Sequence, residues 1–337
     1  MRRVALAVVL AVTLLAFRAS PGVAEEVNLM FATLTPPDYS SNTRVYTPWA
    51  EKVNAAGKGV VHIEIRTGMA LANSANVYDR VAANVMQIGV GIPGLVGGKF
   101  PLTDVVGLPF VTDDPETGSV AFWRLYKTGR LDAEYKDIVP LALTMYLPQA
   151  VHVAKAPASL DDLKGLRLRI VSKISSDIVT RLGGTPMALD PADIYAGIQR
   201  GMIDGVSMSW AGLGQLNLQE VTSFHIDTAL GTGATMVFMA RKTYDALPEA
   251  ARKILDQYSG ESFSRAAGAN FNQEGNEQLA PIIASGKHTI VKLSPKQEAE
   301  WRQAIDPVIA AWETNHPGGA KLYETYRQLL ADVKAGK

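Results

Sequence analysis

Segments with the apolar alternation of a β-strand are interleaved along the chain with segments that have the apolar spacing of a helix. The first strand-like segments are residues 27–34, 60–68 and 86–90, and helical segments at 41–56 and 76–84 separate them. Strands that alternate with helices are typical of βαβ units, whose strands lie mostly parallel in a sheet covered by helices. The alternation therefore predicts an α/β fold.

The same pattern returns in the second half of the chain with different residues. Strand-like segments at 138–146, 150–156, 166–171 and 203–209 accompany a helix at 190–201. The chain of 337 residues is long enough for two such units. We expect two lobes joined by strands that pass from one to the other, with a ligand in the cleft at the carboxyl ends of their strands.

Beyond Pro248 the pattern becomes mainly helical. It predicts a long helix over 249–285, a strand within 287–293, and helices near 295–315 and 319–335.

The first 24 residues have the three parts of a secretory signal peptide. Arg2 and Arg3 precede an apolar run over 4–17, and small residues follow up to Ala24. The run is shorter than the roughly twenty residues that span a bilayer. We therefore expect cleavage after Ala24 and a mature protein in the periplasm.

Composition excludes several classes of site and partner. The chain has no cysteine, so it has neither disulfides nor thiolate metal sites. Its 33 basic side chains equal its 33 acidic ones, which gives no overall field to attract nucleic acid or anionic lipid. Any anion that binds must be held by local groups.

One glycine-rich stretch resembles a dinucleotide-binding fingerprint. Gly89, Gly91 and Gly94 have the spacing G-x-G-x-x-G. The fingerprint requires a helix after the loop, and here Pro93 and further glycines follow. We interpret the stretch as a loop that leaves a strand and forms a wall of the cleft, where glycine lets the backbone approach a small ligand.

No motif points to catalysis. The sequence lacks a G-x-S-x-G elbow, an H-E-x-x-H helix and a P-loop, and its five histidines have no paired metal spacing. We expect a binding protein with no cofactor and no metal; a secreted hydrolase is the alternative class.

Two runs in the middle of the chain resemble the DctP-type solute-binding proteins of TRAP (tripartite ATP-independent periplasmic) transporters. They are ASLDDLKGLRLRIVS, starting at residue 158, and GGTPMALDPADIYAGIQRGMIDG, starting at residue 183. FPLTDVVGLPFV over 100–111 and TYDALPEAARKIL over 243–255 fit the same family in order and spacing.

The resemblance implies a two-lobed periplasmic binding protein fold of the type II kind, with two mixed sheets flanked by helices and a long helix bracing both lobes. It places residues 25–146 and about 235–275 in lobe I, and 147–234 and about 276–337 in lobe II. It also implies that the protein, which we expect to be a monomer, captures an organic acid. Two separate membrane subunits would then import that acid with sodium. A sensor protein that serves no transporter is an alternative.

The resemblance also selects the anchor for the ligand. Arg167 and Arg169 lie two residues apart on one strand and face the same side, so their spacing does not distinguish them. The family's binding arginine corresponds to Arg169. A guanidinium suits this role because it is always charged and forks two donors onto a carboxylate.

Departures from better-known members of the family bear on the ligand. A second arginine is replaced by Gln149, a sugar-facing glutamate by a position near Ile92, and the D-G-Q-E-N stretch by residues 204–208. Each change removes polarity, which predicts an aromatic or hydrophobic monocarboxylate; a sugar acid or C4 dicarboxylate is the alternative. The predicted lining comprises Trp210, Met208, Phe31, Tyr146 and Met145, while His152 is interpreted as structural.

Overall fold

The computed structural model describes residues 26–161, 163–170 and 172–337. The predicted signal peptide, residues 1–24, lies outside the described residues. None of the helices formed by the described residues is long and apolar enough to cross a membrane.

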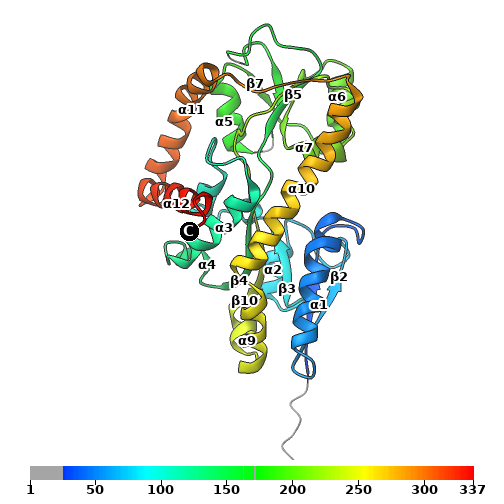
Figure 1. The fold of residues 1–337 in the computed structure, drawn as a ribbon, viewed down its shortest axis with the longest axis vertical. Coiled ribbons are helices and arrows are strands. Elements are labelled where there is room, and N and C mark those ends of the chain that lie inside the picture. Colours follow the sequence, from blue (N-terminus) through cyan, green and yellow to red (C-terminus); the bar gives the residue numbers. More distant parts are fainter. Residues whose placement is uncertain (1–25, 162, 171) are drawn as a thin grey trace, which may run out of the picture.

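Lobe I is built on a five-stranded sheet with the order β2-β1-β3-β10-β4 (Figure 1). β1, β2 and β3 are parallel, whereas β10 runs antiparallel to both β3 and β4. The strands are β1 (Val27–Ala32), β2 (Val61–Arg66), β3 (Ile88–Gly91), β4 (Ile138–Met145) and β10 (Ala234–Ala240). The helical segments are η1 (Asn42–Tyr46), α1 (Thr47–Ala56), α2 (Val77–Ala82), η2 (Pro93–Leu95), η3 (Thr103–Gly107), α3 (Pro115–Lys127), α4 (Asp132–Tyr135), α8 (Arg241–Asp245) and α9 (Glu249–Tyr258).

Lobe II is built on a six-stranded sheet with the order β11-β9-β5-β8-β6-β7. β6 is parallel to β7 and β8, and β5 is antiparallel to β8 and β9. The strands are β5 (Ala150–Val153), β6 (Arg167–Arg169), β7 (Thr185–Met187), β8 (Gly205–Met208), β9 (Phe224–Ile226) and β11 (Thr289–Val291). The helical segments are α5 (Lys173–Arg181), η4 (Pro191–Asp193), α6 (Ile194–Gln199), α7 (Trp210–Gln215) and η5 (Leu218–Glu220).

Three long helices complete the chain after α9. They are α10 (Glu261–Ser285), α11 (Pro295–Asn315) and α12 (Gly319–Lys334). α10 packs on α3 and β4 of lobe I and on α7 of lobe II, so it is the expected brace across both lobes (Figure 1). Two mixed sheets flanked by helices, with this brace, confirm the predicted fold.

Two boundaries in the helical region differ from the expectations. The helix predicted over 249–285 is broken between α9 and α10 at Gly260, whose φ of +83° suits glycine. α12 was expected in lobe II, but it packs on α3, and its Leu322, Tyr326 and Leu330 are buried in the core of lobe I. The apolar face of α12 matches a groove of lobe I, which the position of α12 in the sequence does not reveal.

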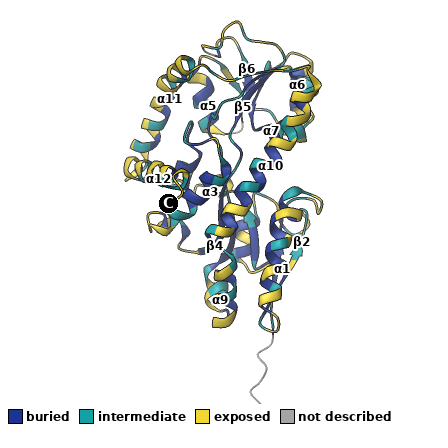
Figure 2. Ribbon diagram, in the orientation of Figure 1, coloured by how far each residue is buried: buried dark blue, intermediate teal, exposed yellow. Residues whose placement is uncertain are grey.

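Each lobe has its own buried core, and the parallel strands of both sheets point toward the other lobe (Figure 2). β4 ends at Met145, and β5 begins at Ala150 after the chain has crossed between the lobes. Because β3 is parallel to β4, and β6 and β8 are antiparallel to β5, their carboxyl ends lie at the facing edges. These edges are where the fold is expected to hold a ligand.

Candidate functional site

Arg169 is the last residue of β6, at the edge of the lobe II sheet that faces lobe I. It is half-buried, and its Nε donates to the backbone carbonyl of Leu189 at 3.2 Å. Among the described residues no carboxylate forms an ion pair with it. Burial lowers the pKa of the guanidinium while the charge of Asp190 opposes that shift. The result is a positive group with donors available at the facing edge.

Arg167, on the same face of β6, has a different environment. Its Nε and Nη2 donate to the two oxygens of Asp204 at 3.0 and 2.9 Å, and Nη2 also donates to the carbonyl of Gly201 at 2.8 Å. This bidentate pairing lowers the pKa of Asp204. Arg167 is therefore committed to holding β6 against the turn before β8, a distinction that the sequence spacing alone could not make.

Three apolar residues neighbour Arg169 at the ends of β6 and β7. Met187 lies opposite Arg169 in the β6–β7 register, and Ile170 and Leu189 follow the two strands. Met187 and Leu189 pack on the cluster that holds Met208 and Trp210, while Ile170 packs on the separate cluster that holds Leu168. All three are half-buried. Our sequence-based reasoning did not single them out, although the signal was present in the apolar residues of the MAL run that leads to Asp190.

Gln149 lies in the segment that crosses between the lobes. It is buried, and its Oε1 accepts a hydrogen bond from Ser207 at 3.1 Å. With the amide oriented by this bond, the NH₂ group is the end that remains available as a donor.

Ile92 and Tyr146 also lie at the facing edges. Ile92 is half-buried directly after β3. Tyr146 directly follows β4, packs edge-on against Phe271 with 4.6 Å between ring centroids, and has its pKa raised to about 12 by burial and by the charge of Glu274.

Phe31 and Met145 are corrections to the predicted lining. Phe31 is fully buried in the core of lobe I, where its ring contacts Tyr46 and Trp49 edge-on. Met145 is 1% exposed and packs against Gly118 of α3. Alternate residues of a strand point to opposite faces of the sheet. The sequence-based prediction assigned Phe31 and Met145 to the cleft, whereas both side chains are buried in lobe I.

The glycine loop also needs a correction. A short 3₁₀ segment, η2, follows β3 in place of a long helix, as expected for a loop that does not bind a dinucleotide. A side chain on Gly89 would meet Val77 and Val81 within 3 Å, and one on Gly91 would meet Phe238 at 3.0 Å. These glycines serve close packing of β3 on α2 and β10, so ligand approach does not explain them.

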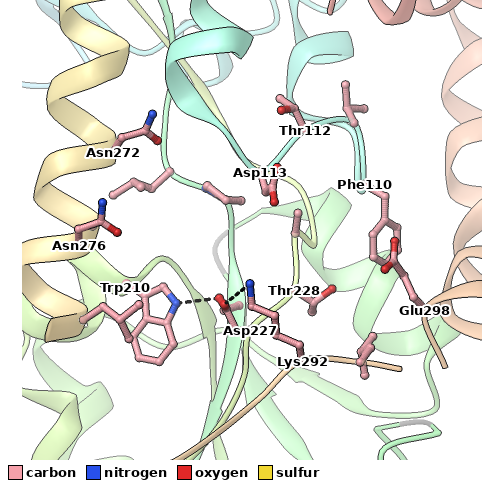
Figure 3. A pocket seen from close by; sticks show the side chains of 18 of the residues that line it. Phe110, Thr112, Asp113, Trp210, Asp227, Thr228, Asn272, Asn276, Lys292 and Glu298 are labelled. Atoms are coloured by element: carbon pink, nitrogen blue, oxygen red, sulfur yellow. Dashed lines mark hydrogen bonds and ion pairs between the residues drawn. The ribbon is translucent and has the colours of Figure 1, made fainter. Parts of the chain in front are cut away.

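Met208 lies on β8, two residues beyond Val206, which pairs with Arg169, whereas Trp210 begins α7 and lines a cavity of its own. The Trp210 indole donates from Nε1 to Asp227 at 3.0 Å and lines a cavity of about 580 Å³, to which Leu147, Pro148 and Ala150 also contribute (Figure 3). Arg169 is not among the residues that line this cavity. Met208 is 7% exposed in a core cluster with Trp210. The structure therefore does not bring the predicted aromatic wall and the predicted anchor into one cavity.

The cavity beside Trp210 has mixed polarity, and two of the cations that line it, Lys292 and Arg302, have carboxylate partners. Lys292 lies 3.8 Å from Asp227, while Arg302 pairs with Glu298 at 2.6 Å and stacks over the ring of Phe110 at 4.3 Å (Figure 3). We place the candidate anion site at Arg169 because a carboxylate there need not displace an existing carboxylate partner.

Three histidines form a chain behind Trp210, and His152 proves structural as expected. His152 Nε2 lies 3.1 Å from the carbonyl oxygen of Met208, and its Nδ1 lies 2.9 Å from Nδ1 of His225. His225 Nε2 lies 3.0 Å from Nδ1 of His288. Burial lowers the pKa of His152 to about 3 and that of His225 to about 4, so both are neutral at pH 7.

The tautomers of the three histidines follow from the contact between His152 and the Met208 carbonyl. A carbonyl can only accept, so His152 carries its proton on Nε2 and accepts at Nδ1. His225 must then donate from Nδ1 and accept at Nε2 from the Nδ1–H of His288. The chain fixes β9 and the loop before β11 to the end of β8, which positions the edge that faces lobe I.

Comparisons with known proteins agree with this architecture. The profile of the DctP family, described as "Bacterial extracellular solute-binding protein, family 7", matches residues 31–315. A TRAP solute-binding protein of Rhodoferax ferrireducens, solved with copurified benzoate, is 29% identical with a TM-score of 0.80, covering 92% of this chain and 100% of its own. A marine metagenome TRAP protein specific for aromatic acid ligands is 26% identical with a TM-score of 0.80, covering 91% and 99%. The C4-dicarboxylate-binding periplasmic protein DctP of Rhodobacter capsulatus is 24% identical, covering 91% of this chain and 92% of its own.

Proposed function

The chain belongs to the DctP family of bacterial extracellular solute-binding proteins, and from that premise we propose that its solute is an aromatic monocarboxylate held by Arg169. The protein is a TRAP solute receptor and not an enzyme. In the proposal it binds the acid between its lobes in the periplasm and delivers it to a sodium-coupled permease of two membrane subunits.

The environment of Arg169 is the observation that carries the proposal. Its guanidinium is half-buried at the lobe-facing edge, and no described carboxylate pairs with it, whereas the neighbouring Arg167 is paired on both nitrogens that face Asp204. A partly desolvated arginine without a counter-ion is favourable for a ligand carboxylate, which can accept two parallel hydrogen bonds.

The surroundings of Arg169 favour an aryl body behind the carboxylate. Met187 and Leu189 offer half-buried apolar surface, and the Gln149 amide is a neutral donor for a ring hydroxyl or a second carboxylate oxygen. The two relatives with aromatic acid ligands, at 29% and 26% identity, support the same class. We do not retain stacking on Trp210, because Arg169 is not among the residues that line the cavity beside its indole.

A C4 dicarboxylate is the second candidate, and the name of the Rhodobacter relative favours it. Its second carboxylate would need another cation, and the resemblance to better-known members implies that Gln149 stands here in place of a second arginine. An unpaired charge in a poorly hydrated cleft costs several kcal/mol.

A ligand screen tests the proposal. We expect benzoate or 3-hydroxybenzoate to raise the melting temperature by mass action and succinate to leave it unchanged at equal concentration. A melting temperature raised by succinate or glucuronate and by no aryl acid would overturn the aromatic assignment. No shift with any acid would count against the cleft as a carboxylate site.

A further inference from the structure

A buried carboxylate in the middle of the long helix α10 joins the two lobes. Glu274 is 5% exposed and forms no ion pair among the described residues. Its Oε1 accepts from the Tyr39 hydroxyl at 2.7 Å and from Gln215 Nε2 at 3.1 Å, and its Oε2 accepts from Ser40 at 3.3 Å. A buried charge without a counter-ion depends on such donors, so their arrangement is tightly constrained.

The donors to Glu274 come from both lobes. Tyr39 and Ser40 belong to the loop that follows β1 in lobe I, and Gln215 is the last residue of α7 in lobe II. Gln215 also contacts the Tyr39 hydroxyl directly, and Tyr146, the residue that begins the crossing segment, has its pKa raised by burial and by the nearby charge of Glu274. The group of Glu274, Tyr39, Gln215 and Tyr146 is hereafter called the Glu274 hub.

Close packing fixes the hub against the hinge. A side chain on Gly275 would meet Leu147 of the crossing segment at 2.9 Å, and one on Gly214 would meet Gln278 of α10 at 2.0 Å. Leu147, Ala211 and Phe271 form a small buried cluster beside the hub. α10, α7 and the crossing segment are therefore in contact where the hydrogen bonds lie.

We propose that the Glu274 hub is the fixed contact about which the lobes rotate, and that Glu274 is a positioning residue for solute capture. The link between Tyr39 and Gln215 keeps the loop of lobe I at one place on lobe II. Restricting the relative positions of the lobes before the solute arrives reduces the ordering that binding must impose. As a statement about solute capture, this inference rests on the proposed function; as a statement about the lobes, it does not.

The test measures the distance between the lobes with and without a solute. The chain has no cysteine, so spin labels can be attached at Lys52→Cys in α1 and Arg200→Cys after α6, both exposed. Gln215→Leu removes the exposed donor from lobe II, and Glu274→Leu removes the hub's acceptor. Glu274→Gln retains an acceptor oxygen for Tyr39 and Gln215, so it should keep the interlobe distance distribution and the benzoate affinity of the unmodified protein.

Glu277→Leu is the matched control. Glu277 lies one turn farther along α10 and pairs with Arg44 of lobe I at 2.9 Å, but the Glu277 side chain is 44% exposed and the Arg44 side chain 39%. An exposed pair of this kind contributes little. The Glu277→Leu substitution therefore removes a second contact between α10 and lobe I without changing a residue of the Glu274 hub.

We expect Gln215→Leu and Glu274→Leu to broaden the interlobe distance distribution of the solute-free protein and to weaken benzoate binding about two- to tenfold, the range of one ordinary hydrogen bond. Glu277→Leu and Glu274→Gln should match the unmodified protein in both readouts. Distributions as narrow as that of Glu277→Leu in both hub variants would overturn the inference. If the unmodified protein does not bind benzoate, the proposed solute is wrong, and the solute-free distributions still decide on the hub.

Discussion

Acidification from pH 7 to pH 5 should destabilise the fold through the histidine chain of lobe II. His152 and His225 have pKa values of about 3 and about 4 in the folded protein, against an ordinary value of 6.5. Between these values and 6.5 the unfolded chain binds protons that the folded chain does not. Stability therefore rises with pH across this window; the contribution is fully present above about pH 6.5 and is lost as the pH falls below it.

The magnitude follows from the two pairs of pKa values. Between pH 7 and pH 5 each histidine contributes about 2 kcal/mol of lost stability, because one pKa unit corresponds to about 1.4 kcal/mol and the unfolded group titrates over about 1.5 units of that range. Both histidines are fully buried, so solvent does not screen the effect. The expected loss is about 4 kcal/mol for the pair.

Urea unfolding at half-unit steps of pH measures this loss, and two variants isolate it. His152→Gln can still donate to the Met208 carbonyl and accept from His225, yet does not titrate, so the loss should fall by about 2 kcal/mol. The control is His62→Gln on the exposed face of β2. If His152→Gln shows the same pH dependence as His62→Gln, or if the His152 and His225 resonances titrate above pH 6, the reasoning is refuted.

Three further changes have defined outcomes. Gly260→Ala should lower the free energy of unfolding by about 1–3 kcal/mol, measured by urea denaturation, because its φ of +83° strains any other residue; an unchanged midpoint would contradict this. Arg167→Ala should reduce benzoate affinity in calorimetry far less than an Arg169 variant does, because the Arg167 donors are already committed to Asp204 and Gly201; equal losses of affinity would contradict the separate roles. Trp210→Phe should lose the bond to Asp227 but keep benzoate affinity within about threefold in calorimetry. A larger loss would return Trp210 to the binding site.

The architecture could be predicted because local patterns and the family motifs agree on it. Alternating strand and helix periods indicate βαβ units, and the motif around the D-L-K-G turn adds the two-lobed arrangement and the helical brace. What these patterns do not contain is the docking of α12 on lobe I, which depends on the fit of its Leu322, Tyr326 and Leu330 to a core assembled from distant segments.

The candidate site was predicted less completely than the fold. Position along a strand could place Arg169 at an edge, but whether Arg167 or Arg169 was already paired depended on Asp204, which is 37 residues from Arg167 in the sequence. For a similar reason the sequence did not show that Trp210 lines a cavity without Arg169. An ungapped count gives the residue that follows a strand, whereas the direction of its ring is set by Asp227 and the histidines packed against it.

The glycine loop illustrates a limit of motif reading. Gly89 and Gly91 have the spacing of a phosphate-binding turn, yet their lack of side chains is required by Val77, Val81 and Phe238. The sequence shows that glycine occupies a position, but only the structure shows whether a packed side chain or a ligand requires the absence of a side chain there.

Calorimetric titration of benzoate into the unmodified protein and into the Arg169→Ala and Arg169→Lys variants tests the central claim most directly. Removing one partner of a partly buried charge pair costs about 2–5 kcal/mol, so Arg169→Ala should bind at least about thirtyfold more weakly with an unchanged melting temperature in the absence of ligand. Arg169→Lys should also bind poorly, since an ammonium cannot reproduce the two-donor fork. An Arg169→Ala variant that binds within about threefold of the unmodified protein would contradict the account.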